Sequence, residues 1–208
     1  MTEPPPTTVS TPRRLINAEA DMWRSLARWI IRRPNPQQPT VSFSYTGAIM
    51  GLIITIIAVS AIEIPIVHYL LRAWPIPQTI ALVLGMYGLF WMFALLASLR
   101  VNPHTLDDHH LKLRFGASFQ VTVPLDSIAH IRVQNHSLPE GKDIQTIDTP
   151  DGTHLHIAVA KQTNIDLDLN DQLTVTMPNG STQQINRLSV YTDQPHALLE
   201  TTNAARHR

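Results

Sequence analysis

Two long apolar runs near the middle of the chain are its strongest pattern. The first run, residues 46–71, contains only Glu63 and His68 as ionisable side chains, and the second, residues 79–99, contains none. Each run reaches the roughly 20 residues that a helix needs to cross the hydrocarbon core of a bilayer. The short connection from Arg72 to Gln78 can only reverse the chain. The sequence therefore predicts an antiparallel transmembrane hairpin over residues 46–99.

The basic residues on either side of the hairpin predict its orientation. Before the first run lie Arg13, Arg14, Arg24, Arg28, Arg32 and Arg33, and after the second lie Arg100, Lys112 and Arg114. The connection between the runs contains Arg72 as its single basic residue. Since cytoplasmic flanks carry the excess of Lys and Arg, we expect both termini in the cytoplasm and a multi-pass protein of the cell membrane.

The residues before the hairpin change character near position 14. Residues 1–13 are rich in Pro and Thr and predict a disordered tail. Residues 14–33 place apolar side chains at helical spacing among arginines and predict an amphipathic helix, which Pro34 and Pro36 end. One interpretation puts this helix on the inner leaflet. The aromatic side chains that then enter the membrane are Trp23 and Trp29. The arginines that meet the lipid headgroups are Arg24, Arg28, Arg32 and Arg33. The other docks it on the hairpin or on the following domain.

After Arg100 the apolar period changes from helical to two. Alternating segments occupy residues 111–115, 119–123, 130–133, 154–160, 164–169, 172–177 and 186–191. Alternation of this kind indicates half-buried strands, and Asp151-Gly152 and Asn179-Gly180 favour tight hairpin turns. We expect an antiparallel meander of six or seven strands over residues 101–208. Asp193 and Pro195 then predict the capped start of a C-terminal helix.

Short strands closed by one helix, after a pair of membrane helices, resemble a known family. The chain resembles the bacterial membrane-anchored pleckstrin-homology-like (PH-like) proteins. The matching segments are residues 101–116, 121–133 and 185–200. The resemblance implies an α+β membrane protein in which the hairpin is followed by an antiparallel PH-like β-barrel or sandwich with a C-terminal helix. It also implies a binding or assembly module in the cytoplasm, and no reaction.

Charge and composition narrow the possible partners. Residues 1–100 carry eight Lys or Arg and four Asp or Glu, whereas residues 101–208 carry eight and twelve. The part that folds in water is therefore acidic, which argues against nucleic acid as a partner. In PH domains that bind phosphoinositides the first hairpin is basic, but here only Lys112 and Arg114 flank that turn. Specific phosphoinositide-type binding is accordingly not expected. The chain has no Cys, which excludes a disulfide framework.

Glu63 is the first candidate functional residue, because an ionisable group within hydrocarbon needs a partner, a proton or water. Counting from the connection places Glu63 and Tyr87 at similar depth, so a carboxyl–phenol hydrogen bond can join the two helices. A position near the outer interface and a role in ion or proton chemistry are the alternatives. His68 lies about 140° around the helix from Glu63 and is expected near the interface.

Four glycines are candidates for close helix packing within the hairpin or with a partner. Gly47 and Gly51 form a G-x-x-x-G pattern, and Gly85 and Gly88 lie on the second helix. Small residues at this spacing let two helix backbones approach closely in a membrane.

Other chemistry is not expected. His154 and His156 share a strand face, but the sequence identifies no third ligand for a metal. Asp166 and Asp168 alternate with apolar residues and predict the solvated side of a strand. No nucleophile elbow or phosphate loop is present. We therefore expect no catalytic residues, metal or cofactor.

The sequence leads to two functional hypotheses. The first is a non-enzymatic, membrane-anchored scaffold that associates with itself or with another membrane protein and recruits partners to its cytoplasmic domain. The second is an accessory subunit of a transporter or membrane enzyme, in which Glu63 makes a polar contact inside the membrane.

Overall fold

The structure, a computed structural model, describes residues 11–31, 41–117, 119–139 and 141–206, with the side chains of residues 11–18 left aside. Arg32, Arg33 and most of the predicted tail lie outside these ranges. Residues 11–13, predicted as part of the tail, begin the first helix.

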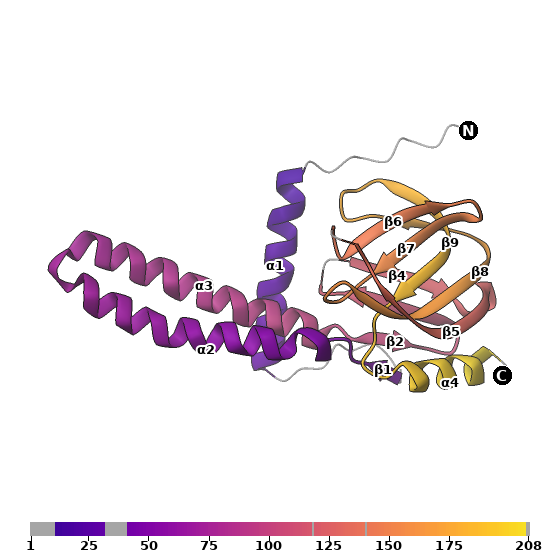
Figure 1. Cartoon of the computed structure of the whole chain (residues 1–208), viewed down its shortest axis with the longest axis horizontal. Helices are drawn as coiled ribbons and strands as arrows, with labels where there is room; N and C mark the ends of the chain where they lie inside the picture. Colours follow the sequence, from indigo (N-terminus) through magenta and orange to yellow (C-terminus); the bar gives the residue numbers. More distant parts are fainter. Residues whose placement is uncertain (1–10, 32–40, 118, 140, 207–208) are drawn as a thin grey trace.

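The described chain forms a long helical hairpin attached to a β-sandwich (Figure 1). Its helices are α1 (Thr11–Ile30), α2 (Gly47–Leu70), α3 (Pro75–Val101) and α4 (Pro195–Arg206), with short 3₁₀ turns η1 (Leu71–Ala73) and η2 (Leu125–Ser127). Its strands are β1 (Val41–Phe43), β2 (His104–Leu106), β3 (His110–Phe115), β4 (Phe119–Pro124), β5 (Ile128–Ser137), β6 (Ile144–Thr149), β7 (Gly152–Ile157), β8 (Gln162–Thr176) and β9 (Thr182–Val190).

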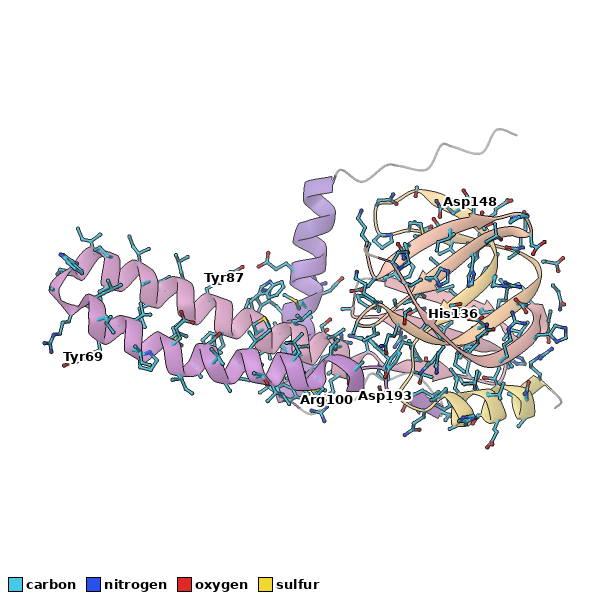
Figure 2. All side chains as sticks on the ribbon, in the orientation of Figure 1. Tyr69, Tyr87, Arg100, His136, Asp148 and Asp193 are labelled. Carbon is cyan, nitrogen blue, oxygen red and sulfur yellow. The ribbon has the colours of Figure 1, made fainter. Side chains whose placement is uncertain are left out.

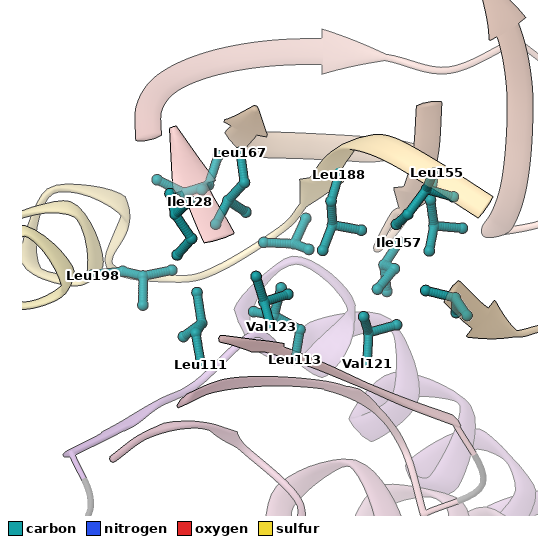
Figure 3. Close-up of a cluster of buried hydrophobic side chains, with 14 of the residues drawn as sticks. Leu111, Leu113, Val121, Val123, Ile128, Leu155, Ile157, Leu167, Leu188 and Leu198 are labelled. Atoms are coloured by element: carbon teal, nitrogen blue, oxygen red, sulfur yellow. The ribbon is translucent and has the colours of Figure 1, made fainter. Parts of the chain in front are cut away.

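Two sheets enclose the core of the sandwich. One sheet has the order β1-β2-β3-β4 and the other β5-β8-β9-β7-β6. Inward-facing side chains of the two sheets meet between them, as Figure 3 shows for Leu113, Val121, Leu155 and Leu188. Leu198 of α4 is fully buried and closes one end of this core. The alternation along the strands thus provides one apolar side for each sheet.

The predicted strands are confirmed in most places, but the antiparallel meander is wrong. Strand β7 pairs with β9 in parallel, and β9 lies between β7 and β8. The two segments predicted at 164–169 and 172–177 are one strand, β8, which continues through an irregularity between Asp168 and Leu173. Residues 187–190 of β9 pair antiparallel with β8 on one side and parallel with β7 on the other, so β9 lies inside the sheet. Strands β1, β2 and β6 were not predicted.

Strand β1 changes the boundary of the domain. It precedes the hairpin, yet it pairs with β2, which follows the hairpin, through Phe43 and His104. The β domain therefore includes residues before position 101, and the hairpin is an insertion between two neighbouring strands.

The hairpin is long, apolar and largely uncovered. Helices α2 and α3 pack antiparallel, and both are long and apolar enough to cross a membrane. Large apolar side chains such as Leu52, Ile62, Ile80 and Leu84 are more than half exposed. Only the last turns of α3 are continuously buried, at Ala94 and from Leu96 to Leu99. Such an exposed apolar surface is typical of a contact with lipid rather than with water.

Helix α1 lies across α3 near the base of the hairpin (Figure 1). Met22 and Ser25 are buried at this contact, and the Asn102 amide is 3.5 Å from the Ser25 hydroxyl. Trp29, Ile30 and Ile31, at the other end of the helix, are exposed. Of the two interpretations of this helix, docking on the hairpin is confirmed, and the exposed apolar end leaves contact with the membrane surface as a further expectation.

Candidate functional site

The hairpin carries a groove that contains the predicted intramembrane residues. It has a volume of about 510 Å³, and its lining includes Ser60, Glu63, Gly85 and Tyr87. The structure therefore brings Glu63 and Tyr87 to one groove. The expected hydrogen bond between them is not formed, because the Tyr87 hydroxyl donates instead to Glu19 of α1 at 2.7 Å. Within the described chain Glu63 has no hydrogen-bond partner, so its carboxyl group is available to a group outside the molecule.

His68 belongs to a different place, the tip of the hairpin. Gln78 donates to the His68 carbonyl at 2.9 Å, and its amide nitrogen is 3.3 Å from His68 Nε2. Arg72 donates to the Tyr69 hydroxyl at 3.0 Å and lies over the Tyr69 ring. Polar and aromatic side chains therefore gather where the hairpin turns (Figure 2). Such side chains are favoured at the boundary between lipid and water.

The four glycines have separate environments. A Cβ at Gly85 would lie 2.9 Å from Ile64 Cγ1, so Gly85 permits the close packing of α3 on α2. Gly51 and Gly88 have nothing within 4 Å of the corresponding position and are open to a neighbour. Gly47 faces the β domain, where its N–H donates to both carboxylate oxygens of Asp193, at 2.9 and 3.1 Å.

Asp193 therefore caps α2, whereas the sequence predicted that it caps α4. The carboxylate lies at the N-terminus of the hairpin helix, where free N–H groups and the helix dipole favour a negative charge. Sequence reasoning missed this contact because it weighed only the nearest helix start. The result is a direct link between the β domain and the apolar hairpin.

A second link is a buried polar cluster at the base of the hairpin. The Tyr45 ring stacks on the His104 ring with centroids 4.6 Å apart, and the Tyr45 hydroxyl accepts from the Gly116 N–H at 2.8 Å. His104 Nδ1 accepts from the Arg114 N–H at 3.0 Å, and Nε2 lies 2.9 Å from the Tyr191 carbonyl. Because an N–H can only donate and a carbonyl can only accept, His104 is neutral with its proton on Nε2.

Burial strengthens this preference for neutral histidine. It lowers the pKa of His104 to about 4, against the smaller opposing effect of the bond to the Tyr191 carbonyl. Burial also raises the pKa of the Tyr45 phenol to about 12. Both groups are therefore uncharged at neutral pH, as expected for parts of a core rather than of a catalytic centre.

Three histidines gather on the outer side of the five-stranded sheet. The His154 and His156 ring centroids are 3.9 Å apart, and the ring centroids of His136 and His156 are 6.4 Å apart. Figure 2 labels His136 within the β domain. His136 Nε2 is 2.9 Å from Asp166, and the Ser189 hydroxyl donates to the same carboxylate while lying 2.7 Å from His154 Nε2. In the described residues, no group of three or more His, Asp or Glu is arranged to hold a metal ion.

The expectation that Asp166 is solvated is wrong. Asp166 is 2 % exposed, since Arg132, His136 and Ser189 surround its carboxylate. Asp168 beside it is less buried and pairs with Arg187 at 2.6 Å and with Arg132 at 3.3 Å. Ser189 is fully buried, so its hydroxyl cannot contact a substrate. The cluster is a charge-balanced network that ties β5, β7, β8 and β9 together.

The residues predicted at the membrane surface that the structure describes do not share one face of α1. Trp23 Nε1 is 3.5 Å from Glu19, and Trp29 is exposed. Arg24 and Arg28 lie on another side and line a cavity shared with Arg114 of β3. The sequence placed Arg24 and Arg28 one helical turn apart, which indicates a common face. No pattern in the sequence predicted that β3 would lie against the face of α1 that carries Arg24 and Arg28.

No protein-family model, curated protein or solved structure gives a significant match to this chain.

Proposed function

We propose that this chain is a membrane-anchored scaffold, whose hairpin spans the cell membrane and whose β domain lies at the cytoplasmic face and binds partner proteins. The observation that carries the proposal is the way in which the base of the hairpin is attached to the β domain. The hairpin is inserted between two paired strands, and Asp193 caps its first helix, so the anchor and the domain are joined at several points. Such an attachment supports a domain that is held in one position against the membrane.

The dimensions of the hairpin support the spanning orientation. Helix α3 has 27 residues, which corresponds to about 40 Å, against the roughly 30 Å of hydrocarbon. About 20 residues counted from the tip fill the bilayer, and the remainder is the buried segment at the domain. The arginine distribution supports a cytoplasmic domain. The PH-like character of the domain and a bacterial origin remain part of the proposal and rest on the sequence resemblance alone.

A second candidate function is an accessory subunit of a membrane transporter or enzyme. Glu63 favours it, because its carboxyl group lines an open groove and has no partner within the described chain. A partner helix that offers a donor to this carboxyl would satisfy it.

Affinity capture from gently solubilised native membranes distinguishes the two functions. The tagged full-length chain is compared with Glu63→Gln, with the control Thr55→Val and with a chain that ends at Arg100. Under the scaffold proposal, soluble proteins are recovered only when residues 101–208 are present, and Glu63→Gln recovers them equally. If one integral membrane protein is recovered from the truncated chain but not from Glu63→Gln, the accessory-subunit function replaces the scaffold. Recovery of no specific protein by any chain contradicts both.

A further inference from the structure

A cavity with three arginine side chains lies between α1 and the β3–β4 hairpin. Its volume is about 560 Å³. Arg24 and Arg28 line it from α1, Arg114 lines it from β3, and Asn102 lies at its edge where α3 ends. Segments that are far apart in the sequence therefore direct cationic side chains to one space.

The cavity has an excess of positive charge. Asp21 is the one carboxylate among its lining residues, and it pairs with Arg24 at 2.7 Å. Arg28 forms no ion pair with any described residue, and its Nη2 donates to the Ser25 hydroxyl at 3.1 Å. Its Nε is buried and has no hydrogen-bond partner in the described part of the chain. Arg28 therefore lines the cavity with no ion pair and with one donor unsatisfied among the described residues.

A phosphate group fits this chemistry. Guanidinium groups present pairs of N–H donors whose geometry matches the oxygens of a phosphate, and these charge-assisted bonds are among the strongest hydrogen bonds in proteins. Burial lowers the pKa of Arg114, and the nearby charge of Arg28 lowers it further. An anion between the two cations would relieve this repulsion, whereas a neutral ligand would not.

The position of the cavity favours a lipid as the source of the phosphate. The cavity adjoins Asn102 at the end of α3, and Gly116 and Ala117 of its lining also line an apolar cavity that extends along α3 to Trp91. In the orientation proposed above, on which this step rests, the arginines lie at the depth of the phospholipid headgroups on the cytoplasmic side.

We propose that this cavity binds a phosphate group, the chemistry shared by phospholipid headgroups and soluble phosphate compounds. Arg28 and Arg114 hold the phosphate oxygens, and Arg24 contributes from the rim. The sequence did not predict this site, because the first hairpin of the domain by itself has too few basic residues.

Two probes distinguish a lipid headgroup from a soluble compound as the source of the phosphate. The first is inorganic phosphate, added to the full-length protein in detergent against chloride at matched ionic strength, with the melting temperature as the readout. The second is phosphatidic acid in phosphatidylcholine nanodiscs, with lipid retained by the protein measured by mass spectrometry. The variants are Arg28→Gln and Arg24→Gln. The control is Arg100→Gln, which removes the same charge from an exposed residue outside the cavity.

We expect saturable stabilisation by phosphate or saturable retention of phosphatidic acid. Arg28→Gln should weaken the affinity for the probe at least about tenfold, and Arg100→Gln should leave the affinity unchanged. Retention of phosphatidic acid alone identifies a headgroup, and stabilisation by inorganic phosphate alone identifies a soluble ligand. If neither probe binds, or if Arg100→Gln weakens binding as much as Arg28→Gln, the site is refuted. A chain that fails to float with vesicles would contradict the proposed membrane anchor, while the inorganic phosphate measurement would still test the cavity.

Discussion

At the scale of single residues, the attachment of the hairpin to the β domain depends on a few polar side chains. Asp193, Tyr45 and His104 each connect the base of the hairpin with the β domain. The connections differ in exposure, because Asp193 is exposed whereas Tyr45 and His104 are almost fully buried. Salt and pH therefore act on them separately.

Replacing Asp193 with Asn should weaken the cap of α2. The variant keeps the side-chain shape but loses the charge that faces the helix N-terminus, so we expect a loss of about 1 kcal/mol in the free energy of unfolding. Denaturant unfolding in detergent micelles measures it, at low and high salt. Asp108→Asn, an exposed carboxylate without such a contact, is the control. An equal loss in both variants would show that the cap does not contribute.

Acid should destabilise the β domain through its buried histidines. Burial lowers the pKa of His104 to about 4, and burial together with the neighbouring His156 lowers that of His154 to about 4. Between about pH 6.5 and 4 the unfolded chain binds protons that the folded chain does not. Stability is therefore full above this window and falls as the pH drops through it, by roughly 3 kcal/mol at most for His104.

The variant His104→Gln tests the contribution of His104 to this loss of stability in acid. A glutamine amide can still accept from the Arg114 N–H and donate to the Tyr191 carbonyl, but it takes up no proton. We expect denaturation midpoints at pH 7 and pH 5 to differ less in this variant than in the unaltered protein. An unchanged pH dependence would mean that His104 is not the source.

At the scale of elements, the hairpin has one packed side and one open side. Gly85 lies against Ile64, whereas Gly88 has no close neighbour. We expect Gly85→Val to separate the helices and destabilise the hairpin by about 1–3 kcal/mol, and Gly88→Val to leave it unchanged. Thermal unfolding of both variants in the same detergent makes the comparison. Destabilisation by Gly88→Val alone would place the contact on the other side.

Helix α1 should lie with one side in lipid and the other toward the domain. Because the chain has no Cys, a spin label at Ile30→Cys or Arg24→Cys is the single label. We expect the label at position 30 to be more accessible to oxygen dissolved in the bilayer, and the label at position 24 to be more accessible to a water-soluble relaxant. Equal accessibility to the water-soluble reagent would mean that α1 docks on the protein without entering the membrane.

At the scale of the whole molecule, the β domain needs the short segment that precedes the hairpin. We expect a chain in which residues 47–101 are replaced by a Gly-Ser linker to fold as a soluble domain, since β1 and Tyr45 remain. A chain that begins at residue 101 lacks both and should unfold at lower denaturant concentration. Circular dichroism compares the two. Equal midpoints would show that β1 adds nothing to stability.

The sequence was a good guide wherever an element depends on its own residues. The apolar runs located α2 within one residue at each end, and alternation located most strands. It was a poor guide wherever two distant segments meet. The parallel pairing of β7 with β9, the cap of α2 by Asp193 and the burial of Asp166 depend on neighbours that no local pattern contains.

The insertion of the hairpin between β1 and β2 also fixes an order of events during synthesis. Strand β1 leaves the ribosome first, but its partner β2 emerges only after both hairpin helices have been made. The four-stranded sheet therefore cannot close until the hairpin has been synthesised and its ends have been brought together. Under the proposed membrane anchoring, completion of the four-stranded sheet would report that the hairpin has turned back correctly, because a hairpin that fails to do so leaves the sheet one strand short.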